Sequence, residues 1–209
     1  MPRTGHVSSD VLTVNEVALL AEAPERSVTK ALEEGVLSAR KASVPSMRLE
    51  TSRKVLDTWS VFYVGLLHDL RESGWSVSLD GKKRIAIYAS RLSPDKEGHD
   101  LELGGPIVLK WSKCRSLMRR RMATAHRYVE VRNRWIVSDD AIQGGTPVIR
   151  GTRMTVYSLL GRVNAGEDLD EIAAENPDIP REALEAALLF AKANPMRGRP
   201  AGRPWRKVA

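Results

Sequence analysis

Apolar side chains recur at three- and four-residue intervals in several stretches of this chain, and each such stretch predicts a helix. The clearest stretch runs from Val55 to Leu70 and ends near Gly74. Residues three and four apart share one face of a helix, so these apolar positions form a continuous stripe for burial. Weaker forms of the same pattern predict two shorter helices, over about residues 11–20 and 25–34.

Local signals mark the ends of the two shorter helices. Thr13 is a candidate N-cap, and Glu16 follows three residues later, which is the spacing of a capping box. Gly35 follows the second helix, at a position where a left-handed C-cap favours glycine. The sequence therefore predicts two helices joined by a tight turn, and then a short basic ribbon over residues 36–40 and 48–49.

Residues 75–112 have a strand-like pattern that is rich in turn residues. Ile85 and Ile87 alternate with small residues, which is the two-residue period of a strand. The elements predicted from here onward are a hairpin over residues 101–109, a basic helix over 112–127 and a second small hairpin over 128–137.

The last third of the chain predicts three short helices. The first covers about residues 155–165 and stops at Gly166. Asp168 is positioned to cap the second, because its carboxylate can accept from the first free backbone N–H groups. Pro180 lies in the first turn of the third helix, where a missing N–H is tolerated.

A glycine-rich segment, residues 144–153, precedes these three helices. Glycine permits positive φ, and proline fixes φ near −65°, so the segment is expected to be stiff and specifically bent. It lacks the Gly-Lys-Ser/Thr ending of a phosphate-binding P-loop and the glycine spacing of a dinucleotide loop. We interpret it as a structural turn, defined by Gly144, Gly145, Pro147, Arg150, Gly151, Thr152 and Arg153.

Composition excludes several classes of protein. No apolar run among the 209 residues is long enough to span a membrane, and the first residues lack the apolar core of a signal peptide. The single cysteine, Cys114, excludes an internal disulfide and fits a reducing cytoplasm. Four scattered histidines give no metal-ligand spacing, and no catalytic set has supporting context. We therefore expect no enzyme, no metal and no cofactor.

The net charge of +7 favours a polyanionic or acidic partner because the positive charge is clustered. Seven arginines lie between residues 114 and 134 against one acid, Glu130. Five cations and no acid lie between residues 195 and 209. The first cluster is equally consistent with a phosphate-facing helix and with a solvated helix face.

The N-terminal pattern of helix, turn, helix and basic ribbon resembles the winged helix-turn-helix of the MerR/excisionase type. The resemblance is carried by Leu12–Ala18, Ser27–Thr29 and Glu34–Leu37, within roughly the first 60 residues. It implies that the second helix enters the major groove and that the ribbon, as a wing, meets the phosphate backbone. Three glutamates make this helix less basic than is usual for a strong DNA reader, and a helical domain for protein contacts is the alternative. The implied DNA-binding residues are Arg26, Ser27, Thr29 and Lys30 on the helix and Arg40, Lys41 and Arg48 on the wing.

Residues 136–194 resemble the small three-helix domain of VapB-type antitoxins. The resemblance is carried by Ile142–Arg153, Asp170–Ala173 and Ala186–Leu188. It implies a cytoplasmic antitoxin of a type II toxin–antitoxin pair that neutralises a VapC-like PIN-domain ribonuclease and regulates its own operon as a homodimer on operator DNA. Acids begin the last helix, and they would repel phosphate, so we expect this domain to serve dimerisation or partner packing rather than DNA reading.

We consider two functional interpretations of the basic C-terminal tail, besides that of a solvated tail without a partner. Its arginines could occupy the metal-binding carboxylates of a PIN ribonuclease, because a guanidinium matches a carboxylate pair in geometry and charge. Alternatively, the tail contains the Arg-Gly-Arg-Pro core of an AT-hook and would add minor-groove affinity to a stand-alone transcription regulator. We favour toxin binding over minor-groove binding. The predicted toxin-binding residues are Arg197, Arg199, Arg203, Trp205 and Arg206.

The predicted fold class is therefore α+β, mainly α. A winged helix-turn-helix domain comes first, a middle region with β-hairpins connects it, and a helix-turn-helix-like three-helix domain ends the fold. The predicted segments are 1–74 for the DNA-binding domain, 75–135 for the connecting region, 136–194 for the three-helix domain and 195–209 for the tail.

Overall fold

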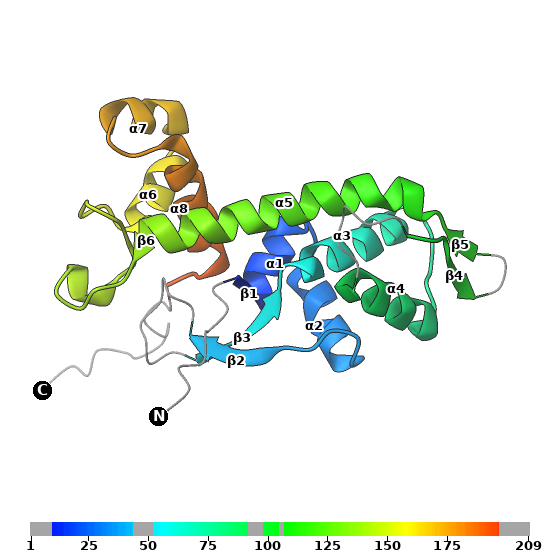
Figure 1. Ribbon diagram of the computed structural model, residues 1–209. Helices are drawn as coiled ribbons and strands as arrows, with labels where there is room; N and C mark the ends of the chain where they lie inside the picture. The colour runs from blue at the N-terminus through cyan, green and yellow to red at the C-terminus, as the bar shows by residue number, and fades with distance from the viewer. Residues whose placement is uncertain (1–9, 44–51, 92–97, 105–106, 197–209) are drawn as a thin grey trace, which may run out of the picture.

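The computed structural model describes residues 10–43, 52–91, 98–104 and 107–196, and within them the fold is mainly helical (Figure 1). Three small antiparallel sheets accompany the helices in this part of the chain. The fold class predicted from the sequence, α+β and mainly α, is confirmed. No helix in the described ranges combines the length and the apolar content needed to cross a bilayer.

The N-terminal unit consists of two short helices beside a three-stranded sheet. The capping box at the start of the first helix is confirmed, because Thr13 accepts from the backbone N–H of Glu16 while the Glu16 side chain accepts from that of Thr13. Gly35 follows the second helix with φ of +66°, as predicted for a left-handed C-cap. The elements are β1 (Val11–Thr13), α1 (Val14–Leu20), α2 (Glu25–Glu33), β2 (Arg40–Ser43) and β3 (Ser52–Asp57), and the sheet order is β1-β3-β2.

A long helix, α5 (Trp111–Trp135), connects the two ends of the molecule. At 1.5 Å per residue its 25 residues span about 37 Å. The elements between β3 and α5 are α3 (Trp59–Glu72), α4 (Leu79–Arg91), β4 (Leu101–Gly104) and β5 (Ile107–Leu109). In Figure 1 the helix α5 crosses the molecule above α1, α3 and α4, while α2 and the sheet of β2 and β3 lie below α1 and α3.

The C-terminal unit is the predicted three-helix arrangement. Thr155 and Asp168 cap the first two helices through their side chains, and Pro180 immediately precedes the third. A two-stranded sheet leads into the helices from the end of α5. The elements are β6 (Ile136–Val137), a 3-10 turn (Gln143–Gly145), β7 (Val148–Ile149), α6 (Val156–Asn164), α7 (Leu169–Glu175) and α8 (Arg181–Ala193).

The glycine-rich segment forms the turn that joins these elements. Gly144 and Gly151 have φ of +61° and +78°, in the left-handed region that favours glycine. The Thr152 hydroxyl donates to the carbonyl of Ile149 and accepts from the backbone N–H of Met154, which closes the turn after β7. Arg150 donates from Nε to the carbonyl of Arg134, so this arginine ties the turn to the end of α5.

Several predictions about secondary structure are wrong. Val11–Thr13 form the strand β1 instead of beginning the first helix, and the first strand of the ribbon is Arg40–Ser43 rather than residues 36–40. Val55 and Leu56 belong to β3, and the helix begins at Trp59 instead. Ile85 and Ile87 lie in α4 rather than in a strand. The hairpin predicted over residues 128–137 is absent, because α5 continues to Trp135. Except for the exposed Ile87, the apolar residues concerned are buried by neighbouring elements. This packing decides between the helical and the strand period, which a short apolar run leaves ambiguous.

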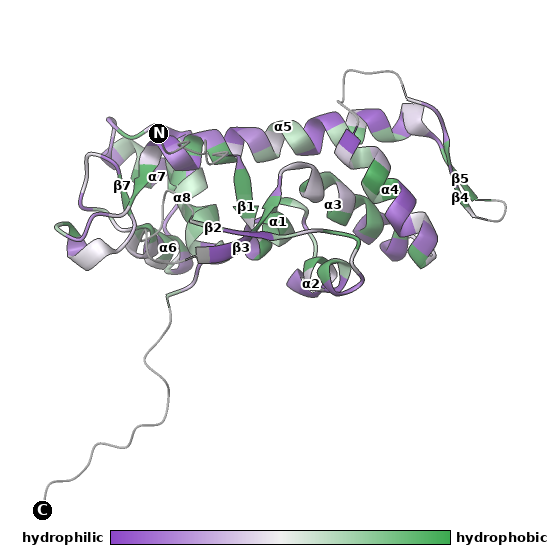
Figure 2. Cartoon of the chain, turned by 60° about the horizontal axis from the view of Figure 1, so that its bottom comes forward, coloured by the Kyte–Doolittle hydropathy of each residue, from purple (hydrophilic) through white to green (hydrophobic). Residues whose placement is uncertain are grey.

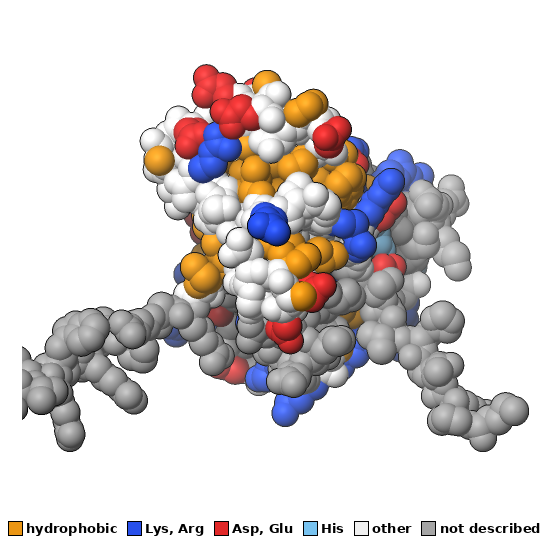
Figure 3. All heavy atoms as spheres, turned by 90° about the vertical axis from the view of Figure 1, so that its left-hand side faces the viewer, with side chains coloured by type: hydrophobic (Ala, Val, Ile, Leu, Met, Phe, Trp, Pro, Cys, Tyr) orange, Lys and Arg blue, Asp and Glu red, His pale blue; other side chains and the backbone are white. Residues whose placement is uncertain are grey.

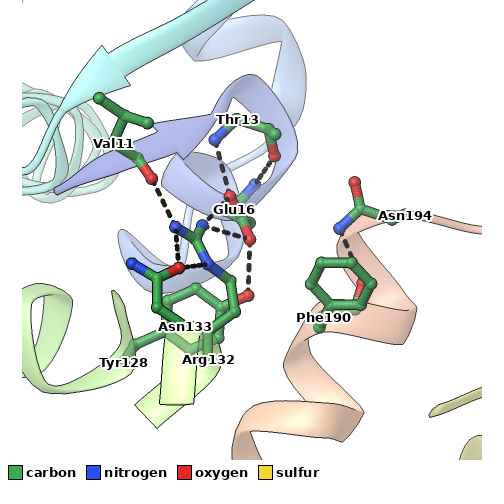
Figure 4. A network of polar contacts seen from close by, with 8 residues as sticks. All are labelled: Val11, Thr13, Glu16, Tyr128, Arg132, Asn133, Phe190 and Asn194. Atoms are coloured by element: carbon green, nitrogen blue, oxygen red, sulfur yellow. Dashed lines mark hydrogen bonds and ion pairs between the residues drawn. The ribbon is translucent and has the colours of Figure 1, made fainter. Parts of the chain in front are cut away.

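A buried ion pair joins α1 to α5 (Figure 4). The side chains of Glu16 and Arg132 are both 0% exposed, and Nη1 of Arg132 lies 2.9 Å from each carboxylate oxygen. Arg132 also donates from Nη2 to the carbonyl of Val11 in β1, and the Tyr128 hydroxyl donates to Glu16 at 2.7 Å. Burial and the charge of Glu16 raise the pKa of Tyr128, so its hydroxyl remains the donor.

The helix α8 packs against both α1 and α5, so the C-terminal unit shares an interface with the N-terminal one. The Asn15 side chain donates from Nδ2 to the carbonyl of Ala193 at 3.0 Å. Residues from the predicted 75–135 connecting region, such as Met118 and Tyr128, lie in the same hydrophobic core as Val17 and Phe62. The described part of residues 75–135 therefore packs against the N-terminal unit and is not a separate linker.

We predict that Arg132→Met destabilises the protein by about 3–5 kcal/mol, because it leaves the buried Glu16 carboxylate without its counter-charge. Arg127→Met, on the same helix, is the matched control. Arg127 lies 2.8 Å from Glu182 but its side chain is 73% exposed, so its loss should cost under about 1 kcal/mol. Urea unfolding followed by circular dichroism measures both. Equal small losses would contradict a structural role for the buried pair.

Candidate nucleic-acid interface

The helix α2 presents a polar face outward because its apolar residues are turned into the core. Val28 and Ala31 are buried, and they share the first hydrophobic core with residues of α1 and α3. Pro24 precedes the helix in an extended conformation, and the following Glu25 places an acid in the first turn, where it complements the helix dipole. The helix is therefore fixed by its inner face and free along its outer one.

The structure brings the four predicted α2 residues to this outer face. Arg26, Thr29 and Lys30 are exposed, and Ser27 is half-buried. Among the described residues, Arg26 forms no ion pair, whereas Lys30 lies 3.8 Å from Glu34 one turn later. Guanidinium, ammonium and hydroxyl groups on one exposed helix face are the donors that can meet base edges and phosphates.

The wing is the β2–β3 hairpin, and its polar residues are brought together by the strand register. Arg40 and Lys41 are exposed on β2, and Arg40 lies 3.8 Å from Asp57 of β3. Arg48, the third predicted wing residue, falls outside the described residues. In Figure 2 the hairpin and α2 lie near one another on the side of the molecule that faces the viewer, and part of the hairpin is coloured as hydrophilic.

The register sets two positive charges against each other on the wing. Lys41 is directly opposite Lys54, and both side chains are exposed. Like charges directly opposite on neighbouring strands destabilise a sheet. This pair is therefore an electrostatic cost to the isolated protein that a polyanion bound across the hairpin would relieve.

The base of the wing lies between two hydrophobic cores. On one face of the sheet, Leu12 and Leu56 belong to the core that holds α1 and α2. On the other face, Val11 and Val55 belong to the core of the C-terminal unit. Because successive residues of a strand point to opposite faces, the same two strands contact both cores, and this fixes the hairpin relative to α2.

The electrostatics of Tyr157 in α6 also reflect this contact. Burial raises the pKa of Tyr157, and the nearby Arg53 guanidinium of β3 acts in the opposite direction. Tyr157 donates from its hydroxyl to the carbonyl of Asn194, directly after α8. The wing strand, the first helix of the C-terminal unit and the end of its last helix therefore meet at one place.

The basic stretch of α5 does not share the surface of α2 and the wing. Arg132 is buried with Glu16, and Arg121 is only 11% exposed and lies 3.0 Å from Asp69 of α3. The helix runs along the side of the molecule opposite to α2 and the hairpin (Figure 1). Two of the seven arginines thus serve packing, and the stretch cannot face the same segment of DNA as α2.

The end of the molecule formed by α6 and α7 carries apolar side chains among charged ones (Figure 3). Leu160 and Val163 of α6 and Leu169 and Ala173 of α7 are half-buried on the second core. This surface belongs to the unit for which the sequence predicts dimerisation or partner packing. The tail residues predicted to bind a toxin, Arg197, Arg199, Arg203, Trp205 and Arg206, lie outside the described residues.

Sequence reasoning missed Lys54 and Arg53 because it ended the ribbon at residue 49 and began a helix at Val55. Arg53 and Lys54 form a basic pair that is followed by the apolar pair Val55 and Leu56, so this segment lacks the two-residue alternation that would have indicated a strand. The pairing of Lys54 with Lys41 follows only from the register of the two strands. Within the described ranges, no group of three or more His, Cys, Asp or Glu side chains could hold a metal ion.

A family model matches the C-terminal unit. Residues 136–191 match the family model described as "Protein of unknown function (DUF433)". The uncharacterized protein y4eO of Sinorhizobium fredii (strain NBRC 101917 / NGR234) is 41% identical over 64 residues, which is 31% of this chain and 29% of that protein. The chain thus spans less than a third of that relative's length.

One solved structure aligns with most of the chain. The X-ray crystal structure of Rv2018 from Mycobacterium tuberculosis has a TM-score of 0.35 and 14% sequence identity, over 85% of this chain and 96% of that one. This similarity is too low to assign a shared fold. The family match accordingly covers the C-terminal unit, and the surface formed by α2 and the wing lies outside it.

Proposed function

We propose that this protein is a regulator that binds duplex DNA, with α2 in the major groove and the β2–β3 wing on the phosphate backbone. The observation that carries the proposal is the opposed pair of Lys41 and Lys54 on the wing. A phosphate backbone supplies closely spaced negative charges of the required sign.

The arrangement of α2 supports the same proposal. Its exposed donors lie on the face that the packing of Val28 and Ala31 leaves outward, and the two cores hold the wing at a fixed position beside it. A helix can read base edges only if it is rigidly positioned relative to a second backbone contact. Phosphate contacts would give affinity, and Arg26 would give sequence discrimination.

We further propose that this regulator is the antitoxin of a toxin–antitoxin pair, with a VapC-like PIN-domain ribonuclease as its partner. The support is the resemblance of residues 136–194 to VapB-type antitoxins, together with the basic tail from residue 195 onward. The apolar surface of α6 and α7 is available to a second copy or to the toxin. A stand-alone regulator whose tail adds minor-groove affinity is the alternative.

We predict that Lys54→Gln weakens DNA binding and lowers the slope of log K against log salt by about one phosphate contact. The free energy of unfolding should not fall, because the substitution removes the repulsion of Lys41. Fluorescence anisotropy over a salt series measures the first quantity and urea unfolding the second. Arg120→Gln, at an exposed position on α5, is the control and should change neither. An unchanged salt slope for Lys54→Gln would contradict the wing contact.

We predict that Arg26→Ala costs about 1–3 kcal/mol at one base pair of the preferred site and relaxes specificity there. The measurement compares the variant and the parent on a duplex selected from a random library and on its single-base-pair substitutions. Arg91→Ala, at an exposed position at the end of α4, serves as the control. A uniform weakening on all sequences would assign Arg26 to phosphate rather than to base reading.

We predict that deletion of residues 195–209 restores the activity of the partner ribonuclease while the fold and DNA binding by α2 and the wing persist. The protein is co-expressed with the product of the adjacent open reading frame, the complex is purified, and metal-dependent RNA cleavage is assayed. Inhibition by the truncated chain equal to that by the full chain would refute the tail mechanism. Salt-sensitive DNA binding without any complex would favour the stand-alone regulator.

A further inference from the structure

An open cleft of about 1440 Å³ lies between α2, α3 and the segment that joins α3 to α4. One wall is the outer face of α2, including Ser27 and Lys30. The opposite side is made by α3, with the apolar Val64 and Leu67. The proposed reading helix therefore shares its polar face with a concave surface large enough for a small ligand.

Tyr63 of α3 lines this cleft and has an unsatisfied polar group. The residue is 1% exposed, and its hydroxyl has no hydrogen-bond partner within the described part of the chain. Burial, followed by the charge of Glu34, raises the pKa of Tyr63, so the hydroxyl remains a donor at every physiological pH. A buried hydroxyl without a partner is costly, and in native proteins it usually indicates a missing acceptor.

Three side chains follow Tyr63 at a four-residue spacing, and together the four line the cleft from the buried Tyr63 to the exposed Trp75. They are Tyr63, Leu67, Arg71 and Trp75, and all of them line the cleft. Tyr63 and Arg71 are eight residues apart on one helix face, which is about 12 Å along the axis. Trp75 follows the end of α3 and leaves 58% of its surface exposed, which is unusual for so large an apolar side chain.

Charges of both signs line the cleft, and Arg71 is the cation that favours a bound anion. The lining acids are Glu25, Glu33 and Glu34, and the lining cations are Arg26, Lys30, Arg71 and Lys82. The Glu34 carboxylate on the opposite wall is already neutralised by Lys82 at 2.9 Å and by Lys30 at 3.8 Å. Arg71 is exposed and, among the described residues, has no acidic partner. A guanidinium in this position offers two parallel donors to a carboxylate or sulfonate.

We propose that this cleft binds a planar aromatic anion that regulates DNA binding. Its acceptor would meet the Tyr63 hydroxyl, its apolar body would cover Leu67 and stack on Trp75, and its anionic group would pair with Arg71. Because Ser27 and Lys30 belong to the same cleft, a bound ligand occupies space that a DNA backbone would need beside α2. Ligand and DNA are therefore mutually exclusive, and the ligand acts as a releasing effector.

The test uses anilinonaphthalene sulfonate, a bicyclic aromatic anion whose fluorescence rises when it leaves water, with the full-length protein. We expect saturable binding at one site per chain, detected by energy transfer from tryptophan. Arg71→Gln should weaken it about tenfold, and Tyr63→Phe about fivefold, as expected for the loss of a charged and of a neutral hydrogen bond. Tyr63→Phe should leave the melting temperature unchanged or higher, because it removes an unpartnered buried hydroxyl.

Two controls separate this site from general dye adsorption. Ile87→Ser removes an exposed apolar side chain of α4 outside the cleft, and Arg91→Gln removes an exposed cation at the end of the same helix. Both should bind the dye like the parent protein. Dye binding that is unchanged in Tyr63→Phe and Arg71→Gln, or that is lost in Ile87→Ser, would overturn the proposal.

A second measurement tests the regulatory role and keeps it separate from the proposed DNA binding. If the parent protein binds a duplex, saturating dye should lower its DNA affinity, and this effect should be weaker in Arg71→Gln. DNA affinity that falls in Arg71→Gln without dye would make the cleft part of the DNA site and overturn the effector role. Failure to bind any duplex would refute the proposed function, while the dye-binding test would still decide whether the cleft is a ligand site.

Discussion

The arrangement of this protein depends on one buried ion pair, Glu16–Arg132. Its carboxylate caps the first helix, and its guanidinium holds the carbonyl of Val11, so the pair fixes a helix start, a strand and the long helix α5 at once. Taking two charges out of water is costly, and only the full set of hydrogen bonds makes the geometry tolerable. If α1, β1 or α5 were shifted in register, either Glu16 or Arg132 would remain buried without its counter-charge. The pair therefore specifies how two segments more than a hundred residues apart meet.

That specification extends to the proposed DNA-binding surface. Through β1, the same contact positions the sheet whose other two strands, β2 and β3, each carry one of the exposed lysines of the wing. The face of the sheet that carries Val11 and Val55 packs against the C-terminal unit, because both residues belong to the core of that unit. A change in how α6 and α8 pack, on binding a partner, would thus reach the wing through direct contact. The three-helix unit and the surface of α2 and β2–β3 are mechanically linked rather than independent modules.

The polar face of α2 has two proposed roles, DNA binding and ligand binding, because it faces both solvent and the cleft between α2 and α3. Ser27 and Lys30 are donors for DNA in one role and form a wall of a ligand site in the other. Regulation by exclusion requires no long-range conformational change, since the bound anion would occupy space beside α2 that the DNA needs. It also accounts for two features that DNA binding alone leaves unexplained, the unpartnered hydroxyl of Tyr63 and the exposed indole of Trp75.

The sequence alone determined several helix ends, because these depend on neighbours in the chain. They are the capping box of Thr13 and Glu16, the glycine after α2 and the Asp168 cap of α7. The sequence also placed the exposed donors of α2, since helical spacing decides which residues face outward. Only the tertiary structure decided that Val55 belongs to a strand, that Ile87 lies on a helix and that α5 continues through residue 135. Three further features follow only from the tertiary structure. Lys54 lies opposite Lys41, Arg132 is the arginine of α5 that is buried with Glu16, and a cleft lies beside α2. These features arise from contacts between distant segments, and periodicity along one segment carries no information about its partner.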